Sequence, residues 1–173
     1  YDGTSCSFCS AGFEFDTKST NCKECGSTKY QAQNDVQGVS CLAWSTCAAG
    51  TKVSTQPTDK VNRACSPCAE GTYQTSNSFT ATSCSFCQAG FAFATKATSC
   101  TPCGSKTYQA QHTVSGVVCA AWKKCTAGKY GSTPTSSVDR TCTPCPDNTY
   151  QDSNSFEETE CTPHSKCAAG KYG

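Results

Sequence analysis

The sequence has almost none of the large aliphatic residues that form the cores of globular proteins. Its 173 residues include no Met, no Ile and one Leu, Leu42. A conventional hydrophobic core therefore cannot form, because the apolar surface is too small to offset the entropy lost when the chain is ordered.

Long apolar runs are missing as well. No stretch approaches the roughly 20 residues of a membrane span or the ~7 to 15 of a signal-peptide core. We expect no membrane span in this segment, and a mature chain or a window cut from a longer one.

Charge of one sign is also scarce. The formal net charge is +1, and Lys123-Lys124 is the only basic pair. No basic stripe is present for nucleic acid, so we expect no nucleic-acid partner. The two histidines, His112 and His164, stand at unlike repeat positions without a companion acid or nucleophile. We therefore expect no enzyme, no cofactor and no metal.

What the sequence has in excess is cysteine. Eighteen cysteines in 173 residues exceed the roughly 8 to 10% that marks a disulfide scaffold. Disulfides at this density replace a core by cross-linking, and they persist in oxidising compartments. The composition predicts an extracellular protein, secreted or at the cell surface.

The cysteines form a tandem repeat. Positions 84 minus 6 and 103 minus 25 both give 78, and 142 minus 65 gives 77. Within this period, longer and shorter modules of about 40 residues alternate. We predict repeat 1 at 6–83, with a long module at 25–65 and the start of a short module at 68–83. Repeat 2 follows at 84–160, with a long module at 103–142, and 161–173 is the truncated continuation of a further long module begun at 145.

The fold class predicted is small, disulfide-rich and β/irregular. A Tyr or Phe follows nearly every first cysteine in a short alternating run, which is typical of one short strand. Runs of Ser, Thr, Asn, Asp and Gly between these strands indicate turns. We expect an elongated rod of tandem modules with short β-hairpins and little or no helix.

One cassette recurs where modules meet. It is CLAWSTCAAG at 41–50, CAAWKKCTAG at 119–128 and CTPHSKCAAG at 161–170. Trp44, Trp122 and His164 share its central position, and we expect these rings to pack at module junctions. A sugar-binding stack is the alternative. Arg63 and Arg140 each stand two residues before a cysteine, and we expect their guanidinium groups to bridge modules by stacking on an aromatic ring or by bonding carbonyls of the next module.

A resemblance to a known family rests on these spacings. Cysteine, then Tyr, a second cysteine about 15 residues on, and a closing D-R-x-C-x-x-C resemble the cysteine-rich domain of the tumour necrosis factor receptor superfamily. The chain is also similar to ephrin-receptor-like repeats and to the tandem cysteine repeats of large protist surface proteins. The residues that carry the match are Cys103, Tyr108, Cys119, Cys125, Asp139, Arg140, Cys142 and Cys145, with counterparts Cys25, Tyr30, Cys41, Cys47, Asn62, Arg63, Cys65 and Cys68.

The resemblance implies a pairing that the sequence alone cannot fix. The implied pairs are Cys9–Cys22, Cys25–Cys41, Cys47–Cys65, Cys68–Cys84, Cys87–Cys100, Cys103–Cys119, Cys125–Cys142 and Cys145–Cys161. Cys6 and Cys167 remain. They pair with upstream and downstream cysteines, stay free, or pair between molecules.

The cysteine spacings are also compatible with two other kinds of site. Cys6, Cys9, Cys22 and Cys25 have the spacing of a four-thiolate zinc site, but the same cysteines continue into gaps that form no metal set. A redox dithiol at Cys65 and Cys68 would need a thioredoxin-like helix start, and no such pattern surrounds it.

The hydroxyl-rich loops suggest a modification. No Asn begins an Asn-x-Ser/Thr sequon, so any glycosylation is through hydroxyls. The candidates occupy equivalent loops of two long modules, and plain solubility is the alternative. They are Ser54, Thr55 and Thr58, and Thr133, Thr135, Ser136 and Ser137.

Near identity between modules favours a structural function, since each module of a tandem array touches only its neighbours and reuses the same surfaces. The sequence predicts the structural repeat of an extracellular filament or cell-surface coat. Its partners would be copies of itself, adjoining repeats of a longer chain, or glycans. The alternatives are a ligand-binding receptor ectodomain and a protist surface antigen that does not assemble.

Overall fold

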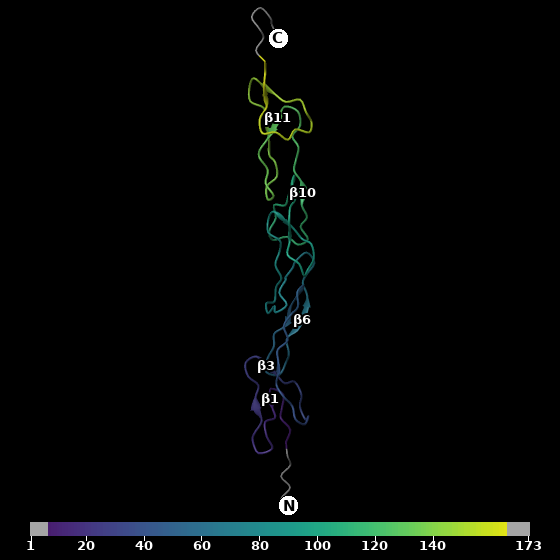
Figure 1. Cartoon of the computed structure of the whole chain (residues 1–173), viewed down its shortest axis with the longest axis vertical. Helices are drawn as coiled ribbons and strands as arrows, with labels where there is room; N and C mark the ends of the chain where they lie inside the picture. Colours follow the sequence, from purple (N-terminus) through teal and green to yellow (C-terminus); the bar gives the residue numbers. More distant parts are fainter. Residues whose placement is uncertain (1–6, 166–173) are drawn as a thin grey trace, which may run out of the picture. The chain divides into compact units, whose positions relative to one another are not determined.

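The computed structural model describes residues 7–165, and within this range it contains short strands and no helix. The predicted small, disulfide-rich β/irregular fold is confirmed. Figure 1 shows the strands as short segments within long irregular stretches of chain. The strands are β1 (Phe13–Glu14), β2 (Lys23–Glu24), β3 (Lys29–Tyr30), β4 (Leu42–Ala43), β5 (Thr51–Thr55), β6 (Ala64–Pro67), β7 (Phe91–Ala92), β8 (Thr101–Pro102), β9 (Thr107–Tyr108), β10 (Ala120–Ala121), β11 (Lys129–Gly131), β12 (Cys142–Pro144), β13 (Thr149–Tyr150) and β14 (Thr162–Pro163).

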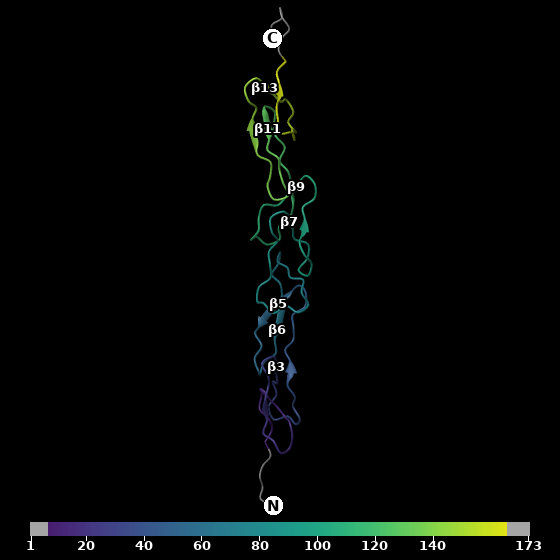
Figure 2. The same ribbon diagram turned by 60° about the vertical axis from the view of Figure 1, so that its left-hand side comes forward.

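Each strand pairs with its neighbour in sequence as an antiparallel two-stranded sheet. Figure 2 shows the longest pair, β5 beside β6, whose register shifts between Val53 and Thr55. Hairpins of this length are marginal in water by themselves, so cross-links are needed to hold them.

A disulfide closes every hairpin. The bonds are Cys9–Cys22, Cys25–Cys41, Cys47–Cys65, Cys68–Cys84, Cys87–Cys100, Cys103–Cys119, Cys125–Cys142 and Cys145–Cys161. These are the eight pairs that the family resemblance implies. Cys6 and Cys167 lie outside the described residues. We call each closed segment a disulfide loop and name it by its two cysteines.

The disulfide loops share one plan. The first cysteine is followed by a turn, and the first strand begins at the fourth residue after it; the second cysteine lies at the start of the second strand or next to it. In the 68–84 loop, the strand pair is reduced to a single bridge between Tyr73 and Ser85. Except at Thr28 in the 25–41 loop, the third residue after the first cysteine has a positive φ, as at Gly12 (φ 93°), a conformation that glycine adopts without steric cost.

The interior consists mostly of disulfides. The side chains that are completely enclosed are Cys47, Cys68, Cys87 and Cys125, and the other buried apolar residues are Cys9, Cys41, Val39, Val53 and Val117. Large apolar residues such as Leu42 and Val118 are instead exposed. The expectation that the chain has no conventional core is therefore confirmed for the described residues.

The chain divides into two compact units. Unit 1 comprises residues 1–85 and 95–99 and contains β1 to β6; unit 2 comprises 86–94 and 100–173 and contains β7 to β14. The repeat boundaries at 6–83, 84–160 and 161–173 stay predictions. No helix in the described part of the chain is long and apolar enough to cross a membrane.

Candidate functional site

The most regular feature of the structure is a set of backbone hydrogen bonds that joins successive disulfide loops. In the first instance, the Gly12 N–H donates to the Gln31 carbonyl (2.8 Å), and the Gly12 carbonyl accepts from the Cys25 N–H (2.8 Å). The Gln31 N–H then donates to the Asp59 carbonyl of the 47–65 loop (2.9 Å). Gln31 thus connects three consecutive disulfide loops. We call this arrangement a joint.

The joint recurs along the chain with nearly the same distances. The second joint consists of Gly50, Cys68, Gln74 and the Lys96 carbonyl; the third, of Gly90, Cys103, Gln109 and the Ser136 carbonyl; and the fourth, of Gly128, Cys145 and Gln151. The bond from the glycine N–H to the glutamine carbonyl is 2.7 or 2.8 Å long in all four. Because these bonds are made by the backbone, the joint depends on loop geometry more than on exposed side chains.

The four joint glutamines are buried, with exposed fractions between 3% and 6%. In the second joint, the Gln74 amide Nε2 donates to the Ala48 carbonyl (2.7 Å) and the Thr51 carbonyl (2.8 Å). Gln151 in the fourth joint donates to two equivalent carbonyls. The amide therefore adds a donor to two carbonyls of the preceding loop, of which Ala48 also accepts from the Thr51 N–H (3.0 Å).

Sequence reasoning missed these glutamines. The signal was present, because Tyr-Gln occurs four times, at 30–31, 73–74, 108–109 and 150–151. In the first and third joints, the Nε2 atoms of Gln31 and Gln109 are buried without a partner among the described residues. The glutamine side chain therefore has two environments, which alternate along the chain.

The tryptophans of the first two cassettes form hydrogen bonds to the disulfide loops before and after them. The Trp44 N–H donates to the Thr28 carbonyl of the preceding loop (3.0 Å), and its indole Nε1 donates to the Thr58 carbonyl of the following loop (3.0 Å). Trp122 makes the same two bonds to Lys106 (2.9 Å) and Thr135 (3.1 Å). Each tryptophan thus connects two disulfide loops, one through its backbone N–H and the other through its indole.

His164 takes the same position in the last cassette. Its N–H donates to the Asn148 carbonyl (3.0 Å), and its ring stacks on Tyr150 with the centroids 5.0 Å apart and the planes 24° from parallel. His112 is exposed in the 103–119 loop. The structure does not test a sugar-binding stack at these rings.

The two arginines hold the cassette backbone. Nη1 of Arg140 donates to the Lys123 carbonyl (3.1 Å), while Oδ1 of Asp139 accepts from the Lys123 N–H (2.8 Å) and the Arg140 N–H (2.7 Å). Asp139 and Arg140 therefore bond both the N–H and the carbonyl of Lys123. Asn62 and Arg63 hold Ser45 in the same way, at 2.9 Å for its N–H and 2.8 Å for its carbonyl. Each arginine donates to a carbonyl of the cassette that precedes it. The partners expected from the sequence were an aromatic ring or carbonyls of the next module.

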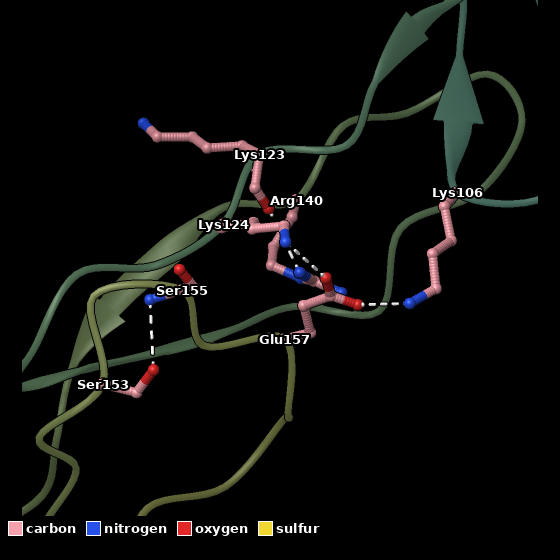
Figure 3. Close-up of polar contacts among 7 residues, drawn as sticks. All are labelled: Lys106, Lys123, Lys124, Arg140, Ser153, Ser155 and Glu157. Atoms are coloured by element: carbon pink, nitrogen blue, oxygen red, sulfur yellow. Dashed lines mark hydrogen bonds and ion pairs between the residues drawn. The ribbon is translucent and has the colours of Figure 1, made fainter.

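Charged side chains cluster around the bonds between Arg140 and Lys123 in unit 2. Figure 3 shows Glu157 reaching toward Lys106 and Lys124, at 2.8 Å and 3.2 Å between the nitrogen and oxygen atoms. The hydrogen bonds from Lys106 and Lys124 lower the pKa of Glu157. The nearby Asp139 carboxylate raises the pKa of Tyr108. The ion pairs connect the 103–119 and 145–161 loops across the intervening cassette.

The equivalent positions in unit 1 carry no charge. Matching CGSTKY to CGSKTY, and SNSFT to SNSFE, places Thr28, Thr46 and Thr80 where unit 2 has Lys106, Lys124 and Glu157. The two units therefore share the joints and the cassette but differ at this surface cluster.

The remaining predicted sites are placed as follows. The candidate O-glycosylation residues are exposed except Ser137, which is half-buried. The backbone carbonyls of two of these residues accept hydrogen bonds: that of Ser136 from the Gln109 N–H, and that of Thr135 from the Trp122 indole N–H. Cys9, Cys22, Cys25, Cys65 and Cys68 are disulfide-bonded, and no group of three or more His, Cys, Asp or Glu within residues 7–165 is placed to hold a metal ion.

No protein-family model matches the chain, and no curated protein matches it either. Among solved structures, the chain is similar to one in the crystal structure of the mouse RANKL–OPG complex, with 19% identity over 70% of this chain and 91% of that chain and a TM-score of 0.33. It is also similar to a chain of the human RANKL/OPG complex, with 20% identity, coverage of 75% and 80%, and a TM-score of 0.32. At these TM-scores the likeness carries no argument about function. The eight disulfides in tandem modules do fit the tumour necrosis factor receptor-like repeats that the sequence resembles.

Proposed function

We propose that this chain is a non-enzymatic structural array, the repeating part of an extracellular filament or cell-surface coat. The observation that carries the proposal is the recurrence of one joint: the two hydrogen bonds of its glycine occur at four places, and the bond from the glutamine N–H to a later loop occurs at three of them. In a tandem array, each module contacts only its neighbours, so stability is a sum over modules and their interfaces. A joint that works between any two modules can be repeated without a fixed limit, which is what a filament or coat requires.

The distribution of polar groups supports this proposal. The side-chain amides of Gln74 and Gln151, the cassette indoles and Arg140 are engaged with backbone groups of adjoining segments. These side chains hold neighbouring segments of the chain together and are not free to contact a substrate. An extracellular location follows from the disulfides, which form and persist in oxidising compartments.

Negative-stain electron microscopy of the native, unreduced protein tests the proposal. Long fibres with a regular axial repeat are expected, and they should vanish after reduction and alkylation. The matched control is alkylation without prior reduction, which should leave the fibres intact. Isolated, flexible single particles at all concentrations would contradict the structural role.

A second candidate, binding of an acidic protein ligand, is favoured by the unit 2 cluster. Glu157 pairs with Lys106 and Lys124, whereas the Lys123 side chain points away from Glu157 in Figure 3 and forms no ion pair with it among the described contacts. The probe is a fluorescent poly-glutamate peptide, and its anisotropy should rise with the protein. Replacing the three lysines by Thr, Ser and Thr, the residues of unit 1, should abolish the rise without changing the fold. An unchanged titration curve would exclude this surface.

O-glycosylation of the loop hydroxyls is a separate part of the proposal. The exposed candidates Ser54, Thr55 and Thr133 make no side-chain hydrogen bond among the contacts described. A glycan there would extend into solvent, as in a hydrated coat. Mass spectrometry of protease-derived glycopeptides from native material should find them modified, and unmodified peptides covering all three would end this hypothesis.

A further inference from the structure

The chain has two tryptophans, and each stands three residues before the second cysteine of its cassette. The sequences are Trp-Ser-Thr-Cys at 44–47 and Trp-Lys-Lys-Cys at 122–125. In proteins of the secretory pathway, Trp-x-x-Cys is an acceptor sequence for the attachment of one mannose to a carbon atom of the indole. A motif of four residues needs a matching structural context before it indicates a modification. The surroundings of the two indoles supply that context.

Each indole has its polar edge at the surface. Nε1 of Trp44 donates to the Thr58 carbonyl (3.0 Å), and Nε1 of Trp122 donates to the Thr135 carbonyl (3.1 Å). Thr58 and Thr135 are exposed, and they begin equivalent turns, in which each threonine N–H donates to the carbonyl three residues further on (2.9 Å). Cδ1 is bonded directly to Nε1 in the ring, so it lies at the same edge of the indole.

A sugar on Cδ1 is compatible with the hydrogen bonds that the tryptophans make. Cδ1 carries a hydrogen atom that takes part in no hydrogen bond of the cassette, and substitution there leaves the Nε1–H donor in place. Trp44 and Trp122 are half-buried, so the rest of the ring packs while this edge faces the exposed turn. The modified side chain can therefore keep the role that it has in connecting the disulfide loops.

The cysteines of the motif set the time at which the sugar is added. Cys47 and Cys125 are completely enclosed in the folded chain, with exposed fractions of 0%. An enzyme that reads the cysteine of Trp-x-x-Cys therefore acts on the extended chain, before the 47–65 and 125–142 loops close.

We infer that Trp44 and Trp122 are C-mannosylated, each with one mannose on Cδ1. The donor is a lipid-linked mannosyl phosphate. The bond between the anomeric carbon and the phosphate oxygen breaks, and its electron pair leaves with the lipid phosphate. The π electrons of the indole form a carbon–carbon bond from Cδ1 to the anomeric carbon, and the Cδ1 proton passes to a base of the transferase. The reaction requires no external oxidant or reductant.

The third cassette is an internal control. His164 takes the position of the tryptophans, and its ring stacks on Tyr150 with the centroids 5.0 Å apart. Without an indole, the cassette has no acceptor carbon, so the modification is confined to the first two cassettes. The inference goes beyond the filament proposal, and it requires only the passage through an oxidising secretory compartment that the disulfides indicate.

Peptide mass spectrometry of the native protein tests the inference. Peptides that contain Trp44 and Trp122 should each carry the mass of one hexose, and fragmentation should place it on the tryptophan. Alkaline β-elimination is the matched control, because it removes sugars from Ser and Thr but leaves a carbon–carbon bond intact. Unmodified Trp44 and Trp122, or a hexose that β-elimination removes, would overturn the inference.

Moving the motif provides an independent measurement. In protein secreted from cells that contain a C-mannosyltransferase, His164→Trp completes Trp-x-x-Cys with Cys167 and should add one further hexose. His112→Trp puts a tryptophan in an exposed loop three residues before Ser115, and this position should stay unmodified. A hexose at both substituted positions, or at neither, would contradict the assignment.

This inference and the structural function can fail separately. Fibres formed by native protein with unmodified tryptophans would leave the structural function standing and overturn C-mannosylation. Carbon-linked hexoses on protein that stays as single particles would support C-mannosylation and contradict the filament.

Discussion

Replacing Gly131 by alanine should expel the Arg140 side chain from its buried position. Arg140 is 6% exposed, and a Cβ on Gly131 would overlap its Cδ and lie 2.8 Å from both Cγ and Nε. The backbone of Gly131 is held in β11 and by a bond from its N–H to the Glu158 carbonyl (3.1 Å), so the arginine is the group that moves. Unit 1 has Val53 at the corresponding position, where Arg63 is less buried.

Because Arg63 keeps its bond to the Ser45 carbonyl (2.8 Å) beside Val53, the bond from Arg140 to the Lys123 carbonyl sets the upper limit of the expected cost. The guanidinium donates to the Lys123 carbonyl at 3.1 Å, and a hydrogen bond to a charged group contributes about 1.5 to 3 kcal/mol. Local opening of the cassette should therefore become about 10- to 100-fold more frequent. Native-state hydrogen exchange of the Lys123 amide, which Asp139 holds, measures this opening directly.

A double-mutant cycle separates displacement of Arg140 from a general effect of the added methyl group. If Gly131→Ala acts through Arg140, then the double variant Gly131→Ala with Arg140→Ala should cost no more than Arg140→Ala alone. The Ser45 amide, held by Asn62 in unit 1, is the internal control and should keep its exchange rate. Unchanged exchange at Lys123, or costs that simply add, would refute the reasoning.

Three further outcomes are expected. Full reduction should remove hydrogen-exchange protection from the whole chain, since each disulfide loop of this size contributes about 3 kcal/mol in the chain-entropy treatment; protection that survives reduction would mean that another interaction holds the loops. Glu157→Gln should weaken the link between the 103–119 and 145–161 loops, seen as faster exchange there, while Glu160→Gln should not. Because the pKa of Glu157 is lowered in the folded chain, its contribution is complete above the unfolded value near 4.5 and is lost as pH falls through the folded value; exchange that is independent of pH in that window would contradict this. Trp44→Phe removes the bond to the Thr58 carbonyl and should cost about 0.5 to 1.5 kcal/mol in thermal unfolding of the unreduced chain, and no loss would mean that water replaces the indole.

Residues close to the cysteines were predicted well because their environment is local. A Tyr or Phe soon after a first cysteine indicated strands such as β3 and β9, and the hairpins follow from these short alternating runs and the turns between them. The pairing of the cysteines came from the family resemblance, since spacing alone allows many connectivities.

Residues that act between disulfide loops were harder to predict. Gln31 and Gln74 were overlooked because a polar residue after a strand is usually exposed, and only the folded chain brings a preceding turn over the amide. The arginines were expected to stack on an aromatic ring or to bond carbonyls of the next module, whereas Arg63 bonds Ser45 in the preceding cassette. The direction of such a contact depends on how the hairpin folds back, and this is not visible in the spacing.

The sequence by itself determined the cross-linked, repeating character of the protein, because eighteen cysteines and one Leu leave no other way to hold the chain. Only the tertiary structure decided how the loops are joined. The physical reason is that each joint is a set of backbone hydrogen bonds between segments far apart in sequence. Their donors and acceptors are present in every residue, so their partners are selected by the geometry of the folded loops and not by the identity of the side chains.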